Sequence, residues 1–335
     1  MKLATVALSA VLVAGCSAAP DAASPGTQGA DAGDRSPTQF PTGSEDGGTR
    51  KSYPIVLAHG LDGFKNIGPI NYFYGVADAL TQDGHEVYTA EVDAYNSSEV
   101  RGAQLQAFVE NVLVMSGAQK VNLICHSQGG LDCRYVASNI GDKIASVTTI
   151  SAPHRGTPVA DIATGDLPGP MQDAISALLN VLGATIDGKV DMNAQAALDV
   201  LSSKGAAAFS LLHPDNPNVA YYSIAGRSNM SMGDDACGTP TEAPFVARWN
   251  SYPDPVDPLL SATGTILSND VTPSPSNDGL VPVGSARYGT FLGCIPADHL
   301  DEMCQLANDS PGAGNPFDCH LFYRQLADWL VARGY

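Results

Sequence analysis

The sequence predicts an α/β fold whose mostly parallel central sheet is flanked by helices. One observation is that short apolar runs alternate with segments of helical periodicity from residue 53 onward, as in strands joined by crossover helices. Another is that Val121–Leu131 passes from an apolar strand through a glycine-rich corner directly into a helix. Functional residues of such folds lie at the carboxyl edge of the sheet, so we expect reactive side chains where these strands end.

The corner around Ser127 has the pattern of a nucleophile elbow, a strand–turn–helix unit in which a strained serine projects above the sheet. Residues two positions from that serine must be small, because the strand and the helix nearly touch there. Gly129 meets this requirement, whereas Cys125 stands where the G-x-S-x-G pattern has its first glycine. The alternative interpretation is that Ser127 only caps the helix.

The composition indicates an ordinary globular protein, long enough for one large α/β domain or two small ones. The 335 residues are 44% hydrophobic and 16% charged, and the formal net charge is −18. Binding to phosphate groups requires basic clusters, and none is present, so we expect no nucleic-acid partner.

The N-terminal segment predicts export. Lys2 precedes the apolar run 3–14, which is too short to span a membrane and ends in Val-Ala-Gly-Cys, a pattern that looks like a bacterial lipobox. Cys16 would then be lipidated and would anchor the protein to the cell envelope, at the outer membrane or the cell surface. Secretion after cleavage of a plain signal peptide is the alternative. Residues 17–52 are rich in small and polar side chains and predict a disordered tether, so the catalytic domain is expected at 53–335.

The catalytic domain is expected to begin with a buried strand at 53–61 that runs into His59-Gly60. This pattern suits an oxyanion loop, whose backbone N–H groups point at a developing negative charge. Ser97 or Ser98 is expected to cap a helix whose apolar residues share one face. The further elements predicted in order are a helix at 72–82, a strand at 86–90, a helix from Gly130, and strands at 145–151 and 221–225.

A mobile lid is expected at about residues 160–190. Glycine–proline steps precede a run of apolar residues at helical spacing between Met171 and Leu182, directly after a loop of catalytic type. A packed core helix is the alternative for this run.

Two C-terminal loops supply partners for the serine. Asp278 lies in an Asn-Asp-Gly turn, and His299 follows in Asp-His-Leu-Asp. The order serine, aspartate, histidine is that of the α/β-hydrolase triad. His299 would act as the general base, and Asp278 would fix its tautomer.

Six collinear segments together resemble the true lipases of the Pseudomonas and Burkholderia type, bacterial lipase subfamilies I.1 and I.2 of the α/β-hydrolase superfamily. The resemblance extends over nearly everything from residue 53 to 335. The matching segments are Tyr53–Leu61, Asn71–Gly75, Val121–Gly130, Ile150–Pro158, Asn277–Val281 and His299–Glu302.

The resemblance implies the site residues. The triad is Ser127, Asp278 and His299, and the oxyanion hole is formed by the backbone N–H groups of Leu61 and Gln128. It also implies one structural Ca²⁺ ion, since hard oxygen ligands suit calcium. The implied ligands are carboxylates of Asp254 and Asp301 and carbonyl oxygens of Gln305 and Asp309, with Asp257 as a rival for Asp254.

The cysteines depart from the family pattern. Cys237 with Cys294, and Cys304 with Cys319, are candidate disulfides, although the sequence does not fix the pairing. Whether Cys125 pairs or remains a thiol is left open, and the same holds for Cys133.

The activity implied by the resemblance is hydrolysis of long-chain triacylglycerols at a lipid interface, through an acyl-enzyme. Alternatives are a short-chain carboxylesterase, a depolymerase of a polyester such as a polyhydroxyalkanoate, and an inactive surface-binding lipoprotein on a hydrolase scaffold. We expect a monomer, and relatives of this type use a dedicated folding chaperone.

Overall fold

The computed structural model describes residues 52–61, 66–67, 70–165, 185–186, 189–190, 192–228, 236–238, 243–249, 252, 254–258, 260–268, 275–305 and 314–335. All of them belong to one compact unit of the chain. Most of the predicted lid, the tether and Cys16 lie outside these ranges. No helix within them is both long enough and apolar enough to span a bilayer.

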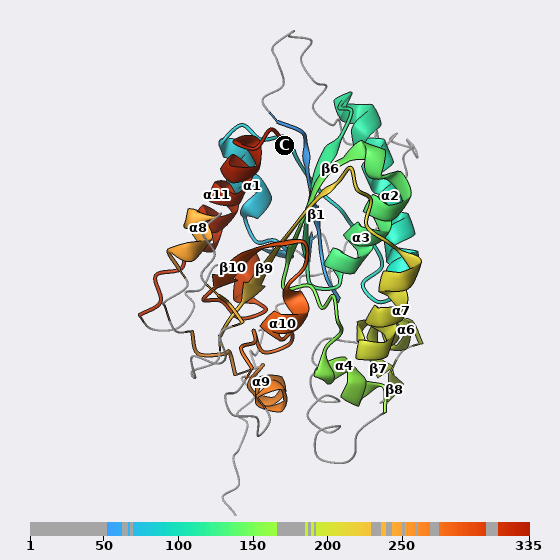
Figure 1. Ribbon diagram of the computed structural model, residues 1–335, viewed down its shortest axis with the longest axis vertical. Helices are drawn as coiled ribbons and strands as arrows, with labels where there is room; N and C mark the ends of the chain where they lie inside the picture. The colour runs from blue at the N-terminus through green and yellow to red at the C-terminus, as the bar shows by residue number, and fades with distance from the viewer. Residues whose placement is uncertain are drawn as a thin grey trace, which may run out of the picture. The chain divides into compact units, whose positions relative to one another are not determined.

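A six-stranded parallel sheet forms the centre of this unit, as the sequence predicts (Figure 1). The strands lie in the order β10-β9-β6-β5-β1-β4, so β5 occupies an interior position. Their bounds are β1 Ile55–Ala58, β4 Val87–Thr89, β5 Val121–His126, β6 Ile144–Ile150, β9 Ala220–Gly226 and β10 Thr290–Ile295. Two short antiparallel pairs lie outside the sheet: β2 Asn66–Ile67 with β3 Ile70–Asn71, and β7 Thr185–Ile186 with β8 Lys189–Val190.

Helices cover both faces of the sheet (Figure 1). One face packs against α1 Val76–Gln82, α8 Pro244–Ala247 and α11 Cys319–Val331, and the other against α2 Ser98–Ser116 and α3 Gly129–Ile140. Side chains alternate along a strand, so in β1 Leu57 joins the core under α1 and α11, while Val56 joins the core under α2 and α3. Because these strands are buried on both faces, their sequences are nearly continuous apolar runs.

Shorter elements gather near the carboxyl ends of the strands. The bounds of these elements are α4 Pro158–Ala163, α6 Met192–Leu201, α7 Ser203–Leu212, α9 Ser261–Leu267, α10 Val283–Ala286 and η2 Asp301–Met303. The short helix η1 Gly141–Lys143 instead joins α3 to the amino end of β6. Helices α4, α6, α7 and α9 share one apolar cluster, which packs beside the site described below.

Local chemistry explains where elements begin. The helix expected from residue 72 starts only at Val76, because Gly75 takes φ 68° and interrupts the helical backbone. Tyr72 and Phe73 are instead buried in the core. Ser97, of the two candidates, caps α2 by accepting from the backbone N–H of Val100. The sequence analysis did not predict β10, which is interrupted by Gly293 at φ 120°.

Candidate active site

Ser127 lies at the corner between β5 and α3, in a backbone conformation that non-glycine residues rarely adopt. Its φ is 54°, and its own N–H donates to the carbonyl oxygen of Ile150 at 3.0 Å. A Cβ on Gly129 would lie 2.6 Å from the carbonyl oxygens of Ala58 and His59, so the helix could not approach the sheet this closely with a larger residue. The predicted elbow geometry is present.

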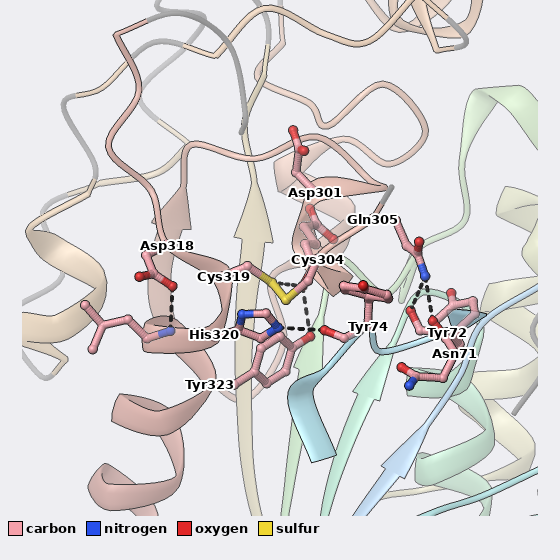
Figure 2. The surroundings of a disulfide bond; sticks show 12 residues. Asn71, Tyr72, Tyr74, Asp301, Cys304, Gln305, Asp318, Cys319, His320 and Tyr323 are labelled. Carbon is pink, nitrogen blue, oxygen red and sulfur yellow. Dashed lines mark hydrogen bonds between the residues drawn. A yellow bond between two sulfur atoms is a disulfide. The ribbon is translucent and has the colours of Figure 1, made fainter. Parts of the chain in front are cut away.

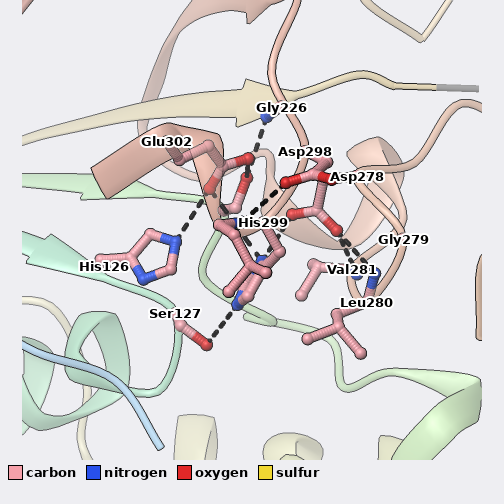
Figure 3. A network of polar contacts seen from close by, with 12 residues as sticks. His126, Ser127, Gly226, Asp278, Gly279, Leu280, Val281, Asp298, His299 and Glu302 are labelled. Carbon is pink, nitrogen blue, oxygen red and sulfur yellow. Dashed lines mark hydrogen bonds and ion pairs between the residues drawn. The ribbon is translucent and has the colours of Figure 1, made fainter. Parts of the chain in front are cut away.

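The structure brings Ser127, His299 and Asp278 together (Figure 3). The Nε2 atom of His299 lies 2.9 Å from Ser127 Oγ, and its Nδ1 lies 2.7 Å from Asp278 Oδ2. The other carboxylate oxygen of Asp278 accepts from the N–H groups of Leu280 and Val281, at 2.8 and 2.6 Å. Burial alone would raise the pKa of Asp278, but the charge and hydrogen bond of His299 and these two N–H groups lower it. An ionised Asp278 can only accept, so His299 carries its proton on Nδ1 and presents Nε2 to the serine as an acceptor.

The segment His59–Leu61, here called the oxyanion loop, lies against the serine. A Cβ on Gly60 would be 2.6 Å from Ser127 Cβ, and Leu61 lines the same pocket as Ser127. The guanidinium of Arg101 donates to the carbonyl oxygens of His59 and Gly60, at 2.7 and 3.1 Å. These bonds orient the peptide groups of the loop from behind.

Arg101 is completely buried and pairs with Asp132 of α3, with Nε 2.8 Å from the carboxylate oxygen. Burial raises the pKa of Asp132 to about 6 although Arg101 opposes the shift. The pair therefore joins the oxyanion loop to the helix that begins at the elbow.

An apolar pocket opens beside Ser127 and His299. Its wall combines α4, α6, the turn after Asp278 and the loop after His299. The lining residues are Leu61, Tyr72, Ser127, Pro153, Thr157, Val159, Ala160, Leu198, Leu201, Leu280, Val281, His299, Leu300 and Met303. The hydroxyl of Thr157 donates to the carbonyl oxygen of Leu280 at 2.6 Å, so even this polar residue offers the pocket little polarity.

A second chain of polar side chains runs beside Ser127, His299 and Asp278 (Figure 3). The centroids of the imidazole rings of His126 and His299 are 4.5 Å apart. His126 Nδ1 lies 2.8 Å from the hydroxyl of Tyr72, and its Nε2 lies 2.9 Å from Glu302 Oε2. Ser151 donates to the other oxygen of Glu302 at 2.5 Å. His126 and Glu302 are fully buried, so this chain ties the elbow strand to the loop that carries His299.

Comparison with known proteins places this geometry in a family. A family model described as the alpha/beta hydrolase fold matches residues 53–235. A triacylglycerol lipase of Vibrio cholerae is 36% identical over 314 residues, which cover 87% of this chain and 91% of that protein. This chain belongs to the α/β-hydrolase fold family. The relatives and the fold together show that it is a serine ester hydrolase.

Further relatives agree. A triacylglycerol lipase of Pseudomonas fragi is 32% identical, covering 80% of the hydrolase and 94% of that protein. The crystal structure of Bacillus licheniformis lipase BlEst2 superposes with a TM-score of 0.55 at 21% identity, covering 76% of the hydrolase and 88% of that chain. The latter likeness supports the fold alone. The family resemblance and the fold class predicted from the sequence are confirmed.

The loop after His299 is fastened to its surroundings from several sides (Figure 2). The disulfide Cys304–Cys319 ties it to the start of α11. The side-chain amide of Gln305 donates to the carbonyl oxygens of Asn71 and Tyr72, at 2.7 and 3.0 Å. The hydrolase thus holds this loop after His299, here called the histidine loop, against the segment that supplies Tyr72 to the pocket.

Buried carboxylates of the hydrolase gather beside this loop. Asp254 is 1% exposed, and its Oδ2 accepts no hydrogen bond from any described residue. Burial and repulsion by Asp298 raise the pKa of Asp254 to about 8, and burial with repulsion by Asp298 and Asp254 raises that of Asp301 to about 9. Asp257, the rival ligand, is half-buried, and its N–H donates to Asp298 Oδ2. Asp309 lies outside the described residues.

The structure resolves the cysteine pairing of the hydrolase. Cys237 pairs with Cys294 and Cys304 with Cys319, the two pairs considered from the sequence. Cys125 and Cys133 also form a disulfide, which answers the question that the sequence left open. The side chain of Cys125 points to the face of the sheet that α3 covers, where the first turns of α3 place Cys133 within reach.

Sequence reasoning missed Arg101, His126 and Glu302. Arg101 lies in the first turn of a helix, where a charged residue normally reads as solvated, and its acidic partner is 31 residues away. His126 and Glu302 are 176 residues apart, so no local pattern connects them. Within the described part of the chain, His126, His299 and Glu302 lie close enough together to share a metal ion, but the hydrogen bonds above already engage them.

Proposed function

We propose that the hydrolase is a triacylglycerol lipase that uses Ser127 as nucleophile, His299 as general base and Asp278 as the partner of the histidine. The observation that carries the proposal is the continuous set of bonds from Ser127 Oγ through His299 to Asp278 beside an apolar pocket. Both curated relatives described above carry the name triacylglycerol lipase.

The geometry supplies each step of an ester hydrolysis. His299 Nε2 takes the proton of Ser127 Oγ as that oxygen attacks the acyl carbonyl carbon, and Asp278 stabilises the imidazolium that forms. The N–H groups of Leu61 and Gln128 would stabilise the oxyanion. His299 then protonates the leaving alkoxide, and a water molecule, deprotonated by the same nitrogen, releases the fatty acid from the acyl-enzyme.

The lining of the pocket supports one of the candidate substrate classes more than the others. Its walls are mostly apolar, which favours a fatty acyl chain over a small or polar acyl group. A short-chain esterase or a polyester depolymerase would use the same chemistry on a different substrate.

The test compares triacylglycerols of graded chain length, a dissolved short-chain ester and a polyhydroxyalkanoate film, with the parent and Ser127→Ala. A lipase prefers the emulsified long-chain substrate, and the variant loses roughly 10⁶ in kcat on each substrate that the parent hydrolyses.

Charged replacements at Leu178 and Leu179, within the predicted lid, test the lid hypothesis in the same assay. If the lid interpretation holds, activity on emulsions falls more than activity on the dissolved ester.

Calcium binding is proposed at Asp254 and Asp301, with the carbonyl oxygens of Gln305 and Asp309. The orphaned, buried oxygen of Asp254 and the mutual repulsion of the carboxylates fit a site that a cation would neutralise. Asp254 fits better than Asp257, whose side chain is less buried. The bound ion would supply positive charge that fixes the histidine loop, and would take no part in the chemistry.

Export and attachment to the cell envelope through Cys16 are proposed from the lipobox. We also propose that the signal peptide and lipobox end at residue 16 and that the tether ends at residue 52. We further propose that the enzyme is a monomer and that a folding chaperone assists it. Cys16→Ser tests the anchor, because the variant should leave the membrane fraction of expressing cells while its specific activity stays unchanged. Retention of the variant in the membrane fraction would contradict lipid anchoring.

A further inference from the structure

The disulfide Cys125–Cys133 encloses the nucleophile within a covalent ring. Cys125 is two residues before Ser127 and Cys133 six residues after it, and the bond joins the end of β5 to α3. Both cysteines are fully buried. The ring therefore contains the serine, the N–H group of Gln128 and the two glycines of the turn.

The strand end of this ring is held firmly by the sheet. Cys125 pairs with Ala58 of β1 on one side and with Thr149 of β6 on the other. The disulfide transfers that fixed position to the first turns of α3. In the G-x-S-x-G pattern a glycine at this position only permits close approach of strand and helix, whereas here the approach is fixed by a covalent bond.

The serine conformation needs such support. A non-glycine residue at φ 54° is strained and persists only where its surroundings over-determine it. On the strand side the support is the bond from Ser127 N–H to Ile150, and on the helix side the bond from Gly130 N–H to the carbonyl oxygen of Ser127 at 2.9 Å. Without the disulfide, β5 and α3 could separate and relax the turn between these two supports.

We propose that the Cys125–Cys133 bond positions the catalytic groups, because it holds Ser127 Oγ and the N–H of Gln128 where the reaction requires them. The inference rests on the proposed role of Ser127 as nucleophile. Neither cysteine lines the pocket, so the bond acts on the rate of reaction at Ser127 and leaves substrate binding unaffected.

The test uses two variants that lack the Cys125–Cys133 bond, here called the clamp variants, and one control. Cys125→Ala/Cys133→Ala removes the bond, and Cys125→Ala/Cys133→Val removes it while restoring buried volume. Cys237→Ala/Cys294→Ala removes a disulfide that ends on β10, three strands away from β5. We would measure the second-order rate constant for labelling by a fluorophosphonate, kcat and KM on a dissolved short-chain ester, and the melting temperature. All rates are taken well below the lowest melting temperature.

The expected result is a fall of about tenfold or more in labelling rate and kcat for both clamp variants, with KM within about twofold. The physical reason is that misplacing a reacting group by about 1 Å can lower a rate by roughly a hundredfold. The control should lower the melting temperature and leave the labelling rate within about twofold. Parental rates in either folded clamp variant would overturn the proposal, as would failure of both to fold, since the bond would then be a structural staple. If the parent enzyme is not labelled at Ser127, the proposed function itself is wrong.

Discussion

If calcium binds at the proposed site, its removal should make the stability of the enzyme strongly dependent on pH. Asp254 and Asp301 have pKa values raised to about 8 and about 9, mainly by burial and then by neighbouring carboxylates. The unfolded chain ionises both near pH 4. The folded state without the ion is therefore favoured at low pH, and this advantage is lost progressively as the pH rises from about 4 through the folded pKa values.

The size of this pH effect follows from the linkage between proton binding and folding. Each carboxyl that is protonated when folded and ionised when unfolded removes about 1.4 kcal/mol of stability per pH unit. For two carboxyls the free energy of unfolding of the stripped enzyme should fall by up to roughly 5 kcal/mol between pH 5 and pH 7. Calcium bound at the proposed site would keep both groups ionised in the folded state and would remove this dependence. The rise in melting temperature caused by calcium should then be roughly 10 °C larger at pH 7 than at pH 5.

The assay is thermal unfolding at pH 5, 6 and 7, in excess calcium and after exhaustive chelation. Asp254→Asn/Asp301→Asn is the matched control, because it removes both titrating groups together with the proposed ligands. The control should show neither the calcium-induced rise nor the steep pH dependence. Identical pH profiles for the stripped and loaded parent enzyme would refute both the ion site and the electrostatic reasoning.

Two buried polar residues behind the site yield further predictions. Arg101→Met leaves the Asp132 carboxylate buried without its partner and should cost roughly 3–5 kcal/mol in urea unfolding. The same variant should lower kcat by roughly tenfold to a hundredfold at 15 °C, because the oxyanion loop loses the donors that orient it. His126→Phe removes the imidazole between Tyr72 and Glu302 and should destabilise the enzyme by roughly 1–3 kcal/mol for each polar group left unpaired. It should also lower kcat more than it changes KM, since it loosens the tie between the elbow and the histidine loop.

A surface ion pair provides the control for these variants. Arg324 lies 2.8 Å from Asp83, and both side chains are about one-third exposed. Arg324→Met should therefore change the free energy of unfolding by less than about 1 kcal/mol and leave kcat unchanged. Losses of the same size in Arg101→Met and Arg324→Met would contradict the role assigned to the buried guanidinium.

Local patterns in the sequence were enough to predict five of the six strands of the central sheet, all except β10, and the corner at Ser127. The elbow at Ser127 is a contiguous pattern of apolar strand, small turn and helix, and each part has a direct physical requirement. Asp278 and His299 were predicted from their order and their turn chemistry, and the structure places both beside Ser127. What is predictable in this way depends on neighbours along the chain.

Most of what the sequence did not predict depends on how helices and strands pack against one another. Whether Cys125 meets Cys133 is decided by the angle at which α3 leaves the sheet, which no residue pattern specifies. The burial of Arg101 depends on how α2 packs against α3, where a Cβ on Gly102 would lie 2.6 Å from the ring of Tyr135. The helix expected from residue 72 fails because the glycine at its actual start adopts a left-handed conformation that the apolar periodicity conceals.

The central claim is that Ser127 is the nucleophile of a lipase. The most direct measurement is to react the enzyme with a phosphonate analogue of a long-chain triacylglycerol and to locate the adduct by peptide mass spectrometry. We expect one adduct per chain, on Ser127 Oγ, formed in step with the loss of triacylglycerol hydrolysis, and no adduct in Ser127→Ala. Full inactivation with the adduct on any other residue, or unchanged labelling of Ser127→Ala, would contradict it.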